Sequence, residues 1–434
     1  MVTRKEAFQK AYSNLNLSPL VEERALAEFW VEYGADVIDD LEQLIEDDDT
    51  EDGKTIFAGH RGCGKSTLLA QFAKNCEQQG FFVVSFSIAD TIEMSDVNYI
   101  NVLFAIAVNM MESAEIRDVT ISASAKKAFK EWFAVKTQTN IQEASAEGEV
   151  KFNLFTIIKN NLKVSSKVRN ELKLEFEPKV SELVMQINAI AAAIQNASDK
   201  KILVIIDDLD KLDLGVVREL YGDHIKTLFS PGFRIIYTTP MASLRNKALQ
   251  ATMITESDNQ IVEMPVMKLY KQRDFREDDV VSIPKNHDLL CRLLNKRVPS
   301  ELIDSGIANK LVLKSGGVLR ELIRLTNRCC RICLRRVRRE RDPDAVKIDE
   351  AVFEQAVKDI RLDFEVPLGK ADYEILKQTY EKFEPLDPKD QTFLDLLHGL
   401  YALEYRNGEV WYDLHPVVKD LLVLKGVLGE EQAA

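Results

Sequence analysis

The hydrophobic residues of this chain follow two patterns, one in each half. The first 265 residues contain short, continuous apolar runs, which are typical of strands buried on both faces of a parallel sheet. The runs are residues 55–58, 81–86, 202–206, 233–240 and 261–264. Apolar residues at helical spacing separate most of them, so the sequence predicts an α/β fold with a doubly wound parallel sheet.

Helical spacing dominates the rest of the chain. The first fifty residues read as helices, with apolar stripes over residues 20–33 and 35–45. A long insertion, about residues 87–198, separates the second and third strands. It contains predicted helices at 97–111 and 178–196 and a short alternating run at 150–154 that predicts a strand. After about residue 266, helices are predicted at 287–295, 307–313, 318–339 and 350–362.

The last seventy residues change pattern again. Helices are predicted at 373–380 and 391–397. Asn407-Gly408, a strong two-residue turn signal, lies between two short strand-like runs. A further helix begins at Pro416. This order of helix, helix, hairpin and helix predicts a winged-helix domain.

The turn after the first predicted strand carries the clearest chemistry. It fits the phosphate-binding pattern G-x-x-x-x-G-K-[ST] at every fixed position. The matching residues are Gly59, His60, Arg61, Gly62, Cys63, Gly64, Lys65, Ser66 and Thr67. The glycines let the backbone wrap a phosphate. We expect Lys65 to contact the β- and γ-phosphates, Ser66 to ligate Mg²⁺, and the helix from residue 68 to direct its N-terminus at the phosphates.

Two carboxylates follow the third predicted strand. Asp207 and Asp208 come directly after the apolar run 202–206. Because parallel sheets bind ligands at the carboxyl ends of their strands, Asp207 is predicted to hold Mg²⁺ and Asp208 to orient the attacking water. A solvated strand end is the alternative, but a phosphate loop in the same chain favours phosphoryl transfer.

Taken together, these motifs resemble a known family. The phosphate loop, the run Asp207-Asp208-Leu209-Asp210-Lys211 and the strand end Thr238-Thr239-Pro240 resemble the AAA+/STAND branch of the P-loop ATPases. Ser315-Gly316-Gly317-Val318-Leu319-Arg320 is similar to the lid signature of the replication-initiator (origin-recognition) subgroup.

The resemblance implies an ATP- and Mg²⁺-dependent ATPase in which Thr238 or Thr239 senses the γ-phosphate and Arg320 reaches it from a helical lid. Asp208 stands where many members carry Glu, which favours slow or switch-like hydrolysis. Residues 246–249 lack the acidic residue of a guanine-reading motif, so ATP is the expected nucleotide.

Four regions are therefore expected. Residues 1–50 form an N-terminal helical segment, and residues 51–265 form the ATPase core with its insertion. Residues 266–365 form the helical lid, and residues 366–434 form the winged-helix domain.

Composition narrows the choice of partners. The chain has 434 residues and a net charge of −13, which argues against nonspecific nucleic-acid binding by the whole molecule. No apolar run approaching the roughly 18 residues of a membrane span is evident, and the N-terminus lacks a signal-peptide pattern. We expect a cytoplasmic protein without membrane contact.

One predicted helix carries an arginine stripe. At the helical repeat, seven arginines fall on one arc roughly 100° wide, and Cys329, Cys330 and Cys333 fall on the other side. The arginines are Arg320, Arg324, Arg328, Arg331, Arg335, Arg338 and Arg339. Such a stripe is either an ordinary solvated helix face or a binding surface for nucleic-acid phosphates or acidic protein, including the acidic segment at Asp47 to Asp52. The predicted recognition helix around residues 388–398 is not basic, which favours protein contact slightly.

Two functions remain open. The first is an ATP-hydrolysing molecular switch that acts as a homo-oligomer or with a partner protein, as in signalling or antiviral defence systems. The alternative is a nucleotide-gated DNA-binding protein of the initiator or loader type.

Overall fold

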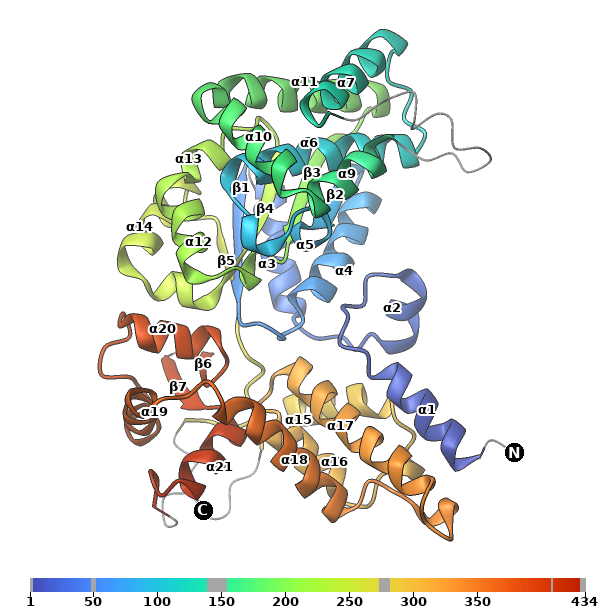
Figure 1. The fold of residues 1–434 in the computed structure, drawn as a ribbon, viewed down its shortest axis with the longest axis vertical. Helices are drawn as coiled ribbons and strands as arrows, with labels where there is room; N and C mark the ends of the chain where they lie inside the picture. Colours follow the sequence, from blue (N-terminus) through green and yellow to red (C-terminus); the bar gives the residue numbers. More distant parts are fainter. Residues whose placement is uncertain (1–2, 48–51, 139–153, 273–281, 407–408, 430–434) are drawn as a thin grey trace. The chain divides into compact units, whose positions relative to one another are not determined.

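Five strands form the sheet on which the candidate site is built (Figure 1). They are β1 (Lys54–Gly59), β2 (Phe81–Ser87), β3 (Lys201–Asp207), β4 (Arg234–Pro240) and β5 (Ile261–Met264). Their order in the sheet is β2-β3-β4-β1-β5, and β3 pairs in parallel with both β2 and β4. β1, β3 and β4 are almost entirely buried. The predicted parallel α/β sheet is confirmed.

The structure is a computed structural model, and it describes residues 3–47, 52–138, 154–272, 282–406 and 409–429. The chain divides into two compact units. The sheet unit contains residues 36–58 and 69–263, and the helical unit contains residues 1–35, 59–68 and 264–434. The phosphate loop therefore belongs to the helical unit, although the strand before it and most of the helix after it belong to the sheet unit.

One helix precedes β1, and further helices connect the later strands, as expected for a doubly wound fold. They are α3 (Ala35–Asp47), α4 (Lys65–Gln78), α12 (Leu214–Arg218), α13 (Ile225–Leu228) and α14 (Lys247–Glu256). The predicted helix at 35–45 corresponds to α3, and the helix expected from residue 68 corresponds to α4, which begins three residues earlier at Lys65.

The described residues of the insertion after β2 form helices and the turns between them, with no strand. It comprises α5 (Ile88–Thr91), α6 (Tyr99–Ile116), α7 (Ala123–Lys136), α9 (Leu154–Val164), α10 (Ser166–Phe176) and α11 (Val180–Ser198). Figure 1 shows α6, α9, α10 and α11 grouped at one end of the sheet. The strand predicted at 150–154 lies mostly outside the described residues. At Leu154 the prediction is wrong, because Leu154 begins α9 and is buried with Ile158 and Leu162 at helical spacing.

α6 corrects the expectation that no helix reaches the length and apolarity of a membrane span. It has 18 residues with a mean hydropathy of 1.2. In the structure 78% of this stretch is buried, and it packs against α9, α10 and α11. Burial on nearly all sides explains its composition, as expected for the core helix of a large domain.

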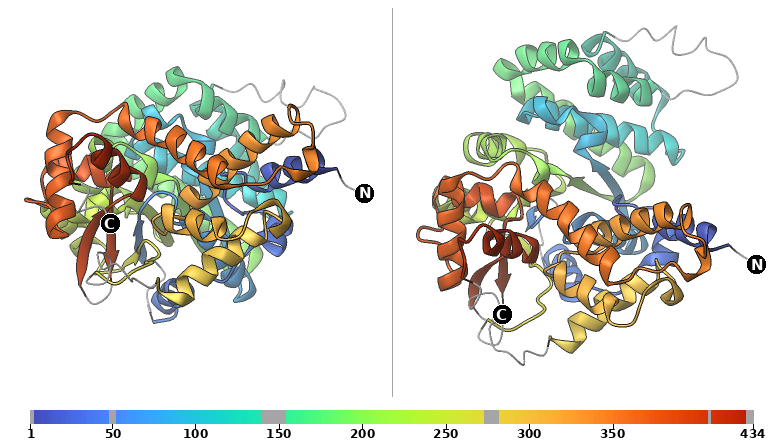
Figure 2. Two further views of the ribbon diagram at one scale, coloured as in Figure 1. Left: turned by 90° about the horizontal axis from the view of Figure 1, so that it is seen from below. Right: turned by 60° about the horizontal axis from the view of Figure 1, so that its bottom comes forward.

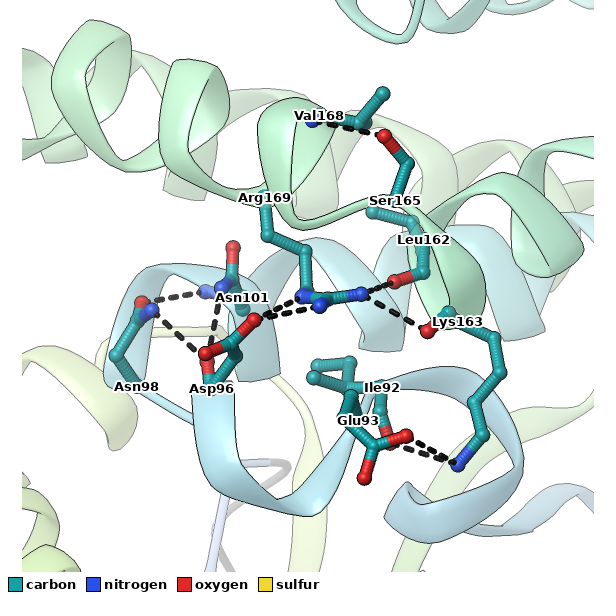
Figure 3. Close-up of polar contacts among 10 residues, drawn as sticks. All are labelled: Ile92, Glu93, Asp96, Asn98, Asn101, Leu162, Lys163, Ser165, Val168 and Arg169. Carbon is teal, nitrogen blue, oxygen red and sulfur yellow. Dashed lines mark hydrogen bonds and ion pairs between the residues drawn. The ribbon is translucent and has the colours of Figure 1, made fainter.

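Two cations from α9 and α10 bond to the first segment of the insertion, directly after β2 (Figure 3). Arg169 is 3% exposed and donates to the carbonyl oxygens of Leu162 and Lys163 at 2.5 and 2.9 Å. It also pairs with Asp96 at 2.5 Å. Lys163 in turn donates to the carbonyl oxygens of Ala89 and Ile92. The junction between α9 and α10 thus holds α5 and the turn after it in place.

The helical unit gathers elements from both ends of the chain. Its helices are α1 (Arg4–Asn14), α2 (Glu23–Phe29), α15 (Pro284–Asn295), α16 (Ile307–Lys314), α17 (Leu319–Val337) and α18 (Glu350–Glu365). α1 packs along α17, as both views of Figure 2 show. The helix predicted at 20–33 is shorter than expected: α2 has no fully buried residue, and Trp30 after it is extended.

The C-terminal part has the order of elements predicted for a winged helix. α19 (Lys370–Lys382) and α20 (Gln391–His398) precede the antiparallel hairpin of β6 (Ala402–Arg406) and β7 (Val410–Leu414), and α21 (Pro416–Leu424) follows. The predicted turn residues Asn407 and Gly408 lie outside the described residues.

A buried histidine joins this part to the lid helices. His415 is 1% exposed and caps α21, because its Nδ1 accepts a hydrogen bond from the Val417 amide at 3.2 Å. Its ring lies 5.0 Å from that of Phe364 in α18, and its Nε2 lies 4.0 Å from the Glu321 carboxylate in α17. Burial, with smaller effects from Arg324 and Lys314, lowers the pKa of His415 from 6.5 to about 3.

This histidine makes stability depend on pH. Because the folded pKa is depressed, the stabilisation is present above about pH 6.5 and is lost as the pH falls toward 3, at up to about 1.4 kcal/mol per pH unit. His415→Asn keeps a capping acceptor but does not titrate. We expect the melting temperature of the variant to fall less than that of wild type between pH 6.5 and pH 4, measured by circular dichroism. Parallel curves for the two proteins would contradict this assignment.

Candidate functional site

The phosphate loop adopts a conformation that only glycine allows at two positions. Gly62 and Gly64 have φ angles of 80° and 97°. A Cβ at Gly62 would lie 2.7 Å from the Cβ of Arg320, and one at Gly64 would lie 2.2 Å from the hydroxyl oxygen of Tyr33. Both the backbone geometry and the lack of space therefore require the glycines of the motif.

The side chain of Lys65 folds back and bonds to the backbone of the loop. It is 4% exposed, and its Nζ donates to the carbonyl oxygens of Gly59 and His60 at 2.9 and 2.7 Å. These bonds hold the ammonium group at the loop. Thr67 uses its hydroxyl oxygen to accept the Leu20 amide at 3.0 Å, whereas Ser66 is half-buried. The N-terminal segment and the loop are therefore fastened together within the helical unit.

The first turn of the lid helix α17 contacts the loop directly. The Arg320 amide donates to the Gly62 carbonyl oxygen at 2.9 Å. Tyr33 donates its hydroxyl hydrogen to the Gly64 carbonyl oxygen at 2.7 Å. Arg320 is therefore close to the loop, as the family resemblance implies, but it is the backbone that bonds. Its guanidinium makes no hydrogen bond or ion pair with any residue that the structure describes.

The C-terminal hairpin and α20 also bond to the loop. The ring Nε2 of His60 accepts a hydrogen bond from the Glu404 amide in β6 at 3.1 Å. Arg61 lies 2.7 Å from the ring Nε2 of His398, the last residue of α20. These contacts were not predicted, because a pattern along the chain carries no signal for a pairing between positions more than 300 residues apart.

The carboxylates after β3 form a cluster in the sheet unit. Oxygen atoms of Asp207, Asp208 and Asp210 lie within 4.8 Å of one another. Asp207 is partly exposed, whereas Asp208 and Asp210 are 9% and 3% exposed. Three carboxylates in one group match the oxygen ligands that Mg²⁺ prefers. Asp210 received no role from the sequence, although its place two residues after Asp208 was a signal.

Asp208 is held from three directions. Its φ of 70° puts it in the left-handed region, and its amide bonds back to the Asp207 carboxylate at 2.8 Å. Ser87, the last residue of β2, donates to its Oδ2 at 2.7 Å. Lys211 forms an ion pair with Oδ1. Ser87 is a second residue that the sequence did not indicate, because its contact with Asp208 depends on the pairing of β2 with β3.

The two threonines at the end of β4 use their hydroxyls within the protein. Thr238 donates to the Ile206 carbonyl oxygen and accepts from the Leu209 amide, both at 3.1 Å. The Thr239 hydroxyl lies 3.0 Å from that of Ser243. Both threonines are fully buried. Thr238 thus fixes the backbone turn that carries the acidic cluster, and its predicted contact with a γ-phosphate stays a prediction.

The arginine stripe on α17 divides into two parts. Arg324 pairs with Glu321 and with Asp363 of α18, and Arg328 lies near Asp359 and Asp363. An acidic neighbour within the same unit therefore covers the first part. The second part consists of Arg331, Arg335, Arg338 and Arg339, which are exposed and form no ion pair with the described residues. Opposite them, Cys329, Cys330 and Cys333 are buried, as predicted.

A glycine-rich loop between β1 and a helix, with carboxylates after β3, another buried strand of the same sheet, defines a P-loop NTPase. Residues 36–263 match the KAP family P-loop domain, and the chain belongs to this family. The predicted class of protein is confirmed. A search of curated proteins found no match.

Three solved structures resemble the chain over nearly its whole length. Cdc6p from Pyrobaculum aerophilum has 10% identity and a TM-score of 0.41, with 97% of this chain and 98% of that chain covered. The Aeropyrum pernix ORC1 protein, solved with DNA, has 12% identity and a TM-score of 0.37, with 94% and 96% covered. The Aeropyrum pernix ORC2 protein, solved as ADPNP–ADP complexes, has 12% identity and a TM-score of 0.36, with 97% and 99% covered. Similarity of this size carries no argument about function.

Proposed function

We propose that this protein is an Mg²⁺-dependent ATP-binding and ATP-hydrolysing molecular switch, whose lid helices and C-terminal domain respond to the nucleotide at the phosphate loop. The observation that carries the proposal is the set of hydrogen bonds from Arg320 to Gly62 and from Glu404 to His60. Because both hydrogen bonds end on residues of the loop, a rearrangement of the loop around a nucleotide would change them.

Membership of the KAP family supports nucleotide binding, and the chain's own residues support the chemistry. A bound nucleotide would draw the Lys65 ammonium away from the carbonyl oxygens of Gly59 and His60, where it now donates. Such a rearrangement of hydrogen bonds gives the loop two states, as a switch requires.

The acidic cluster fits a divalent cation. When bound, Mg²⁺ neutralises phosphate charge. Asp207, the most exposed of the three, is the proposed ligand, together with Ser66. Asp208 is the proposed water-orienting group, and its hydrogen bond from Ser87 and ion pair with Lys211 fix the direction of its carboxylate. Since phosphoryl transfer depends mainly on positioning and charge stabilisation, these residues are sufficient for slow hydrolysis.

ATP binding should depend on Lys65. Lys65→Ala removes a charged donor whose contact with phosphate is worth about 1.5–3 kcal/mol, so affinity should fall roughly ten- to a hundredfold. Calorimetric titration with ATP and Mg²⁺ measures the change. Lys74→Ala, an exposed lysine on the same helix, is the control and should bind as wild type does. Equal affinity in the two variants would refute the role of the loop.

Turnover should depend on Asp208 and on the serine that holds it. Asp208→Asn keeps the shape of the side chain but removes its charge, so ATP should bind normally while phosphate release falls. Ser87→Ala should lower turnover less, because only one hydrogen bond to the carboxylate is lost. Asp213→Asn, at an exposed aspartate near the cluster, is the control. Wild-type phosphate release in Asp208→Asn would exclude Asp208 as the water-orienting group.

A second candidate function is nucleotide-gated DNA binding. The four exposed arginines in the last turns of α17 and directly after it favour this function, because no described carboxylate pairs with them. Replacing Arg331, Arg335, Arg338 and Arg339 together by Gln should reduce duplex binding and flatten its salt dependence, since each phosphate contact adds to the slope. Filter binding over a salt series measures both. If the wild-type protein does not bind duplex DNA at low salt, these arginines are assigned to contact with a protein partner. Light scattering with and without ATP would detect such an assembly.

A further inference from the structure

A cavity of about 720 Å³ lies within the helical unit, apart from the phosphate loop. Its walls come from α1, from the end of α15 and the turn after it, and from the turn at Asp344. No residue of the phosphate loop lines it. Its volume lies within the range of small-molecule sites, about 300–1,000 Å³.

A buried arginine lines this cavity. Arg297 is 5% exposed. Its Nη1 donates to the carbonyl oxygens of Leu293 and Phe29 at 3.0 and 3.4 Å, and its guanidinium carbon lies 5.1 Å from the centre of the Phe29 ring. Among the described residues, no carboxylate lies within ion-pair distance of it.

An isolated buried charge is costly unless an opposite charge compensates it. Burial lowers the pKa of Arg297 to about 10, so the side chain stays protonated at neutral pH. The Leu293 and Phe29 carbonyl oxygens accept hydrogen bonds from Nη1, and the Phe29 ring lies against one face of the guanidinium. The N–H groups at Nε and Nη2 are left to bond a ligand. The partner that matches a guanidinium fork is an oxyanion.

Three more cations line the same cavity, and none of them pairs with a carboxylate in the described part of the chain. Arg4 donates to the carbonyl oxygens of Asp344 and Glu301. Lys296 donates to the Trp30 carbonyl oxygen at 2.6 Å, and Lys10 is exposed.

The cavity also contains acidic residues. Glu28, Glu301 and Asp344 line it, so four cations face three carboxylates. A ligand with negative charge along its whole length would be repelled by these carboxylates. A ligand with one anionic end and an uncharged polar body fits both the cations and the carboxylates. Its anionic end can pair with the cations, and its body can donate hydrogen bonds to the carboxylates.

We propose that this cavity binds a small molecule that carries a single phosphate group, with the phosphate held by Arg297 and Lys296 and an uncharged polar body beside the carboxylates. Two neighbouring cations match the double negative charge of a phosphate monoester better than the single charge of a carboxylate. The site does not depend on nucleotide binding at the phosphate loop.

The test uses sn-glycerol 3-phosphate as the probe, a phosphate monoester with a hydroxylated body. Calorimetric titration at constant ionic strength is made with the full-length Lys65→Ala protein, in which the phosphate loop has lost its phosphate-binding lysine. We expect saturable binding. Adding Arg297→Gln should weaken it on the order of tenfold or more, because charge-assisted hydrogen bonds are lost. Arg292→Gln removes the same charge from an exposed site on α15 outside the cavity, and it should have no effect.

A second substitution protects the test against misfolding. Should Arg297→Gln unfold, as judged by circular dichroism, Lys296→Gln removes an exposed cation and should also weaken binding. The proposal is overturned by the absence of saturable binding to the Lys65→Ala protein, or by equal affinities of the cavity and Arg292 variants. Equal affinity for glycerate, the corresponding carboxylate, overturns the assignment of phosphate.

Discussion

The close contact between the phosphate loop and the first turn of α17 is the constraint around which the helical unit is arranged. Arg320 can donate its amide hydrogen to Gly62 only because residue 62 has no side chain and accepts a φ of 80°. The glycine of the phosphate-binding motif therefore also allows the first turn of α17 to pack directly against the backbone of the loop. The same short segment meets three further partners, namely Tyr33, Glu404 and His398.

In the sheet unit, Ser87 has a similar role in linking distant segments. Ser87 ends β2, begins α5 as its N-cap, and donates to Asp208. Lys163 donates to the carbonyl oxygens of Ala89 and Ile92, and Arg169 bonds to Asp96 and to the Lys163 carbonyl oxygen. A continuous series of hydrogen bonds thus runs from the insertion helices to the acidic cluster. The insertion is therefore part of the support of the candidate site.

The sequence was sufficient for features that depend on short-range pattern. The five strands, the glycines of the phosphate loop and the acidic residues after β3 follow from burial on both faces and from local turn geometry. The strand predicted at Leu154 failed, because alternation over five residues is too short to distinguish a strand from the first turn of an amphipathic helix. Ser87, Asp210 and the cavity at Arg297 could not be predicted, since each depends on which distant segments pack together. Asp208 shows the difference between short-range pattern and long-range packing. Its position after a buried strand can be predicted from the sequence, but its contacts with Ser87 and Lys211 cannot.

The left-handed backbone at Asp208 limits which acid can stand there. Aspartate and asparagine tolerate a φ near 70° better than residues with longer side chains, because their short polar groups bond to the local backbone. A glutamate at this position would carry its carboxylate one methylene further from Ser87 and would fit the turn less well. The left-handed main chain at this position therefore favours aspartate over glutamate. A glutamate substituted here would place a longer side chain at a strained backbone position, unless the path of the chain after β3 changed with it.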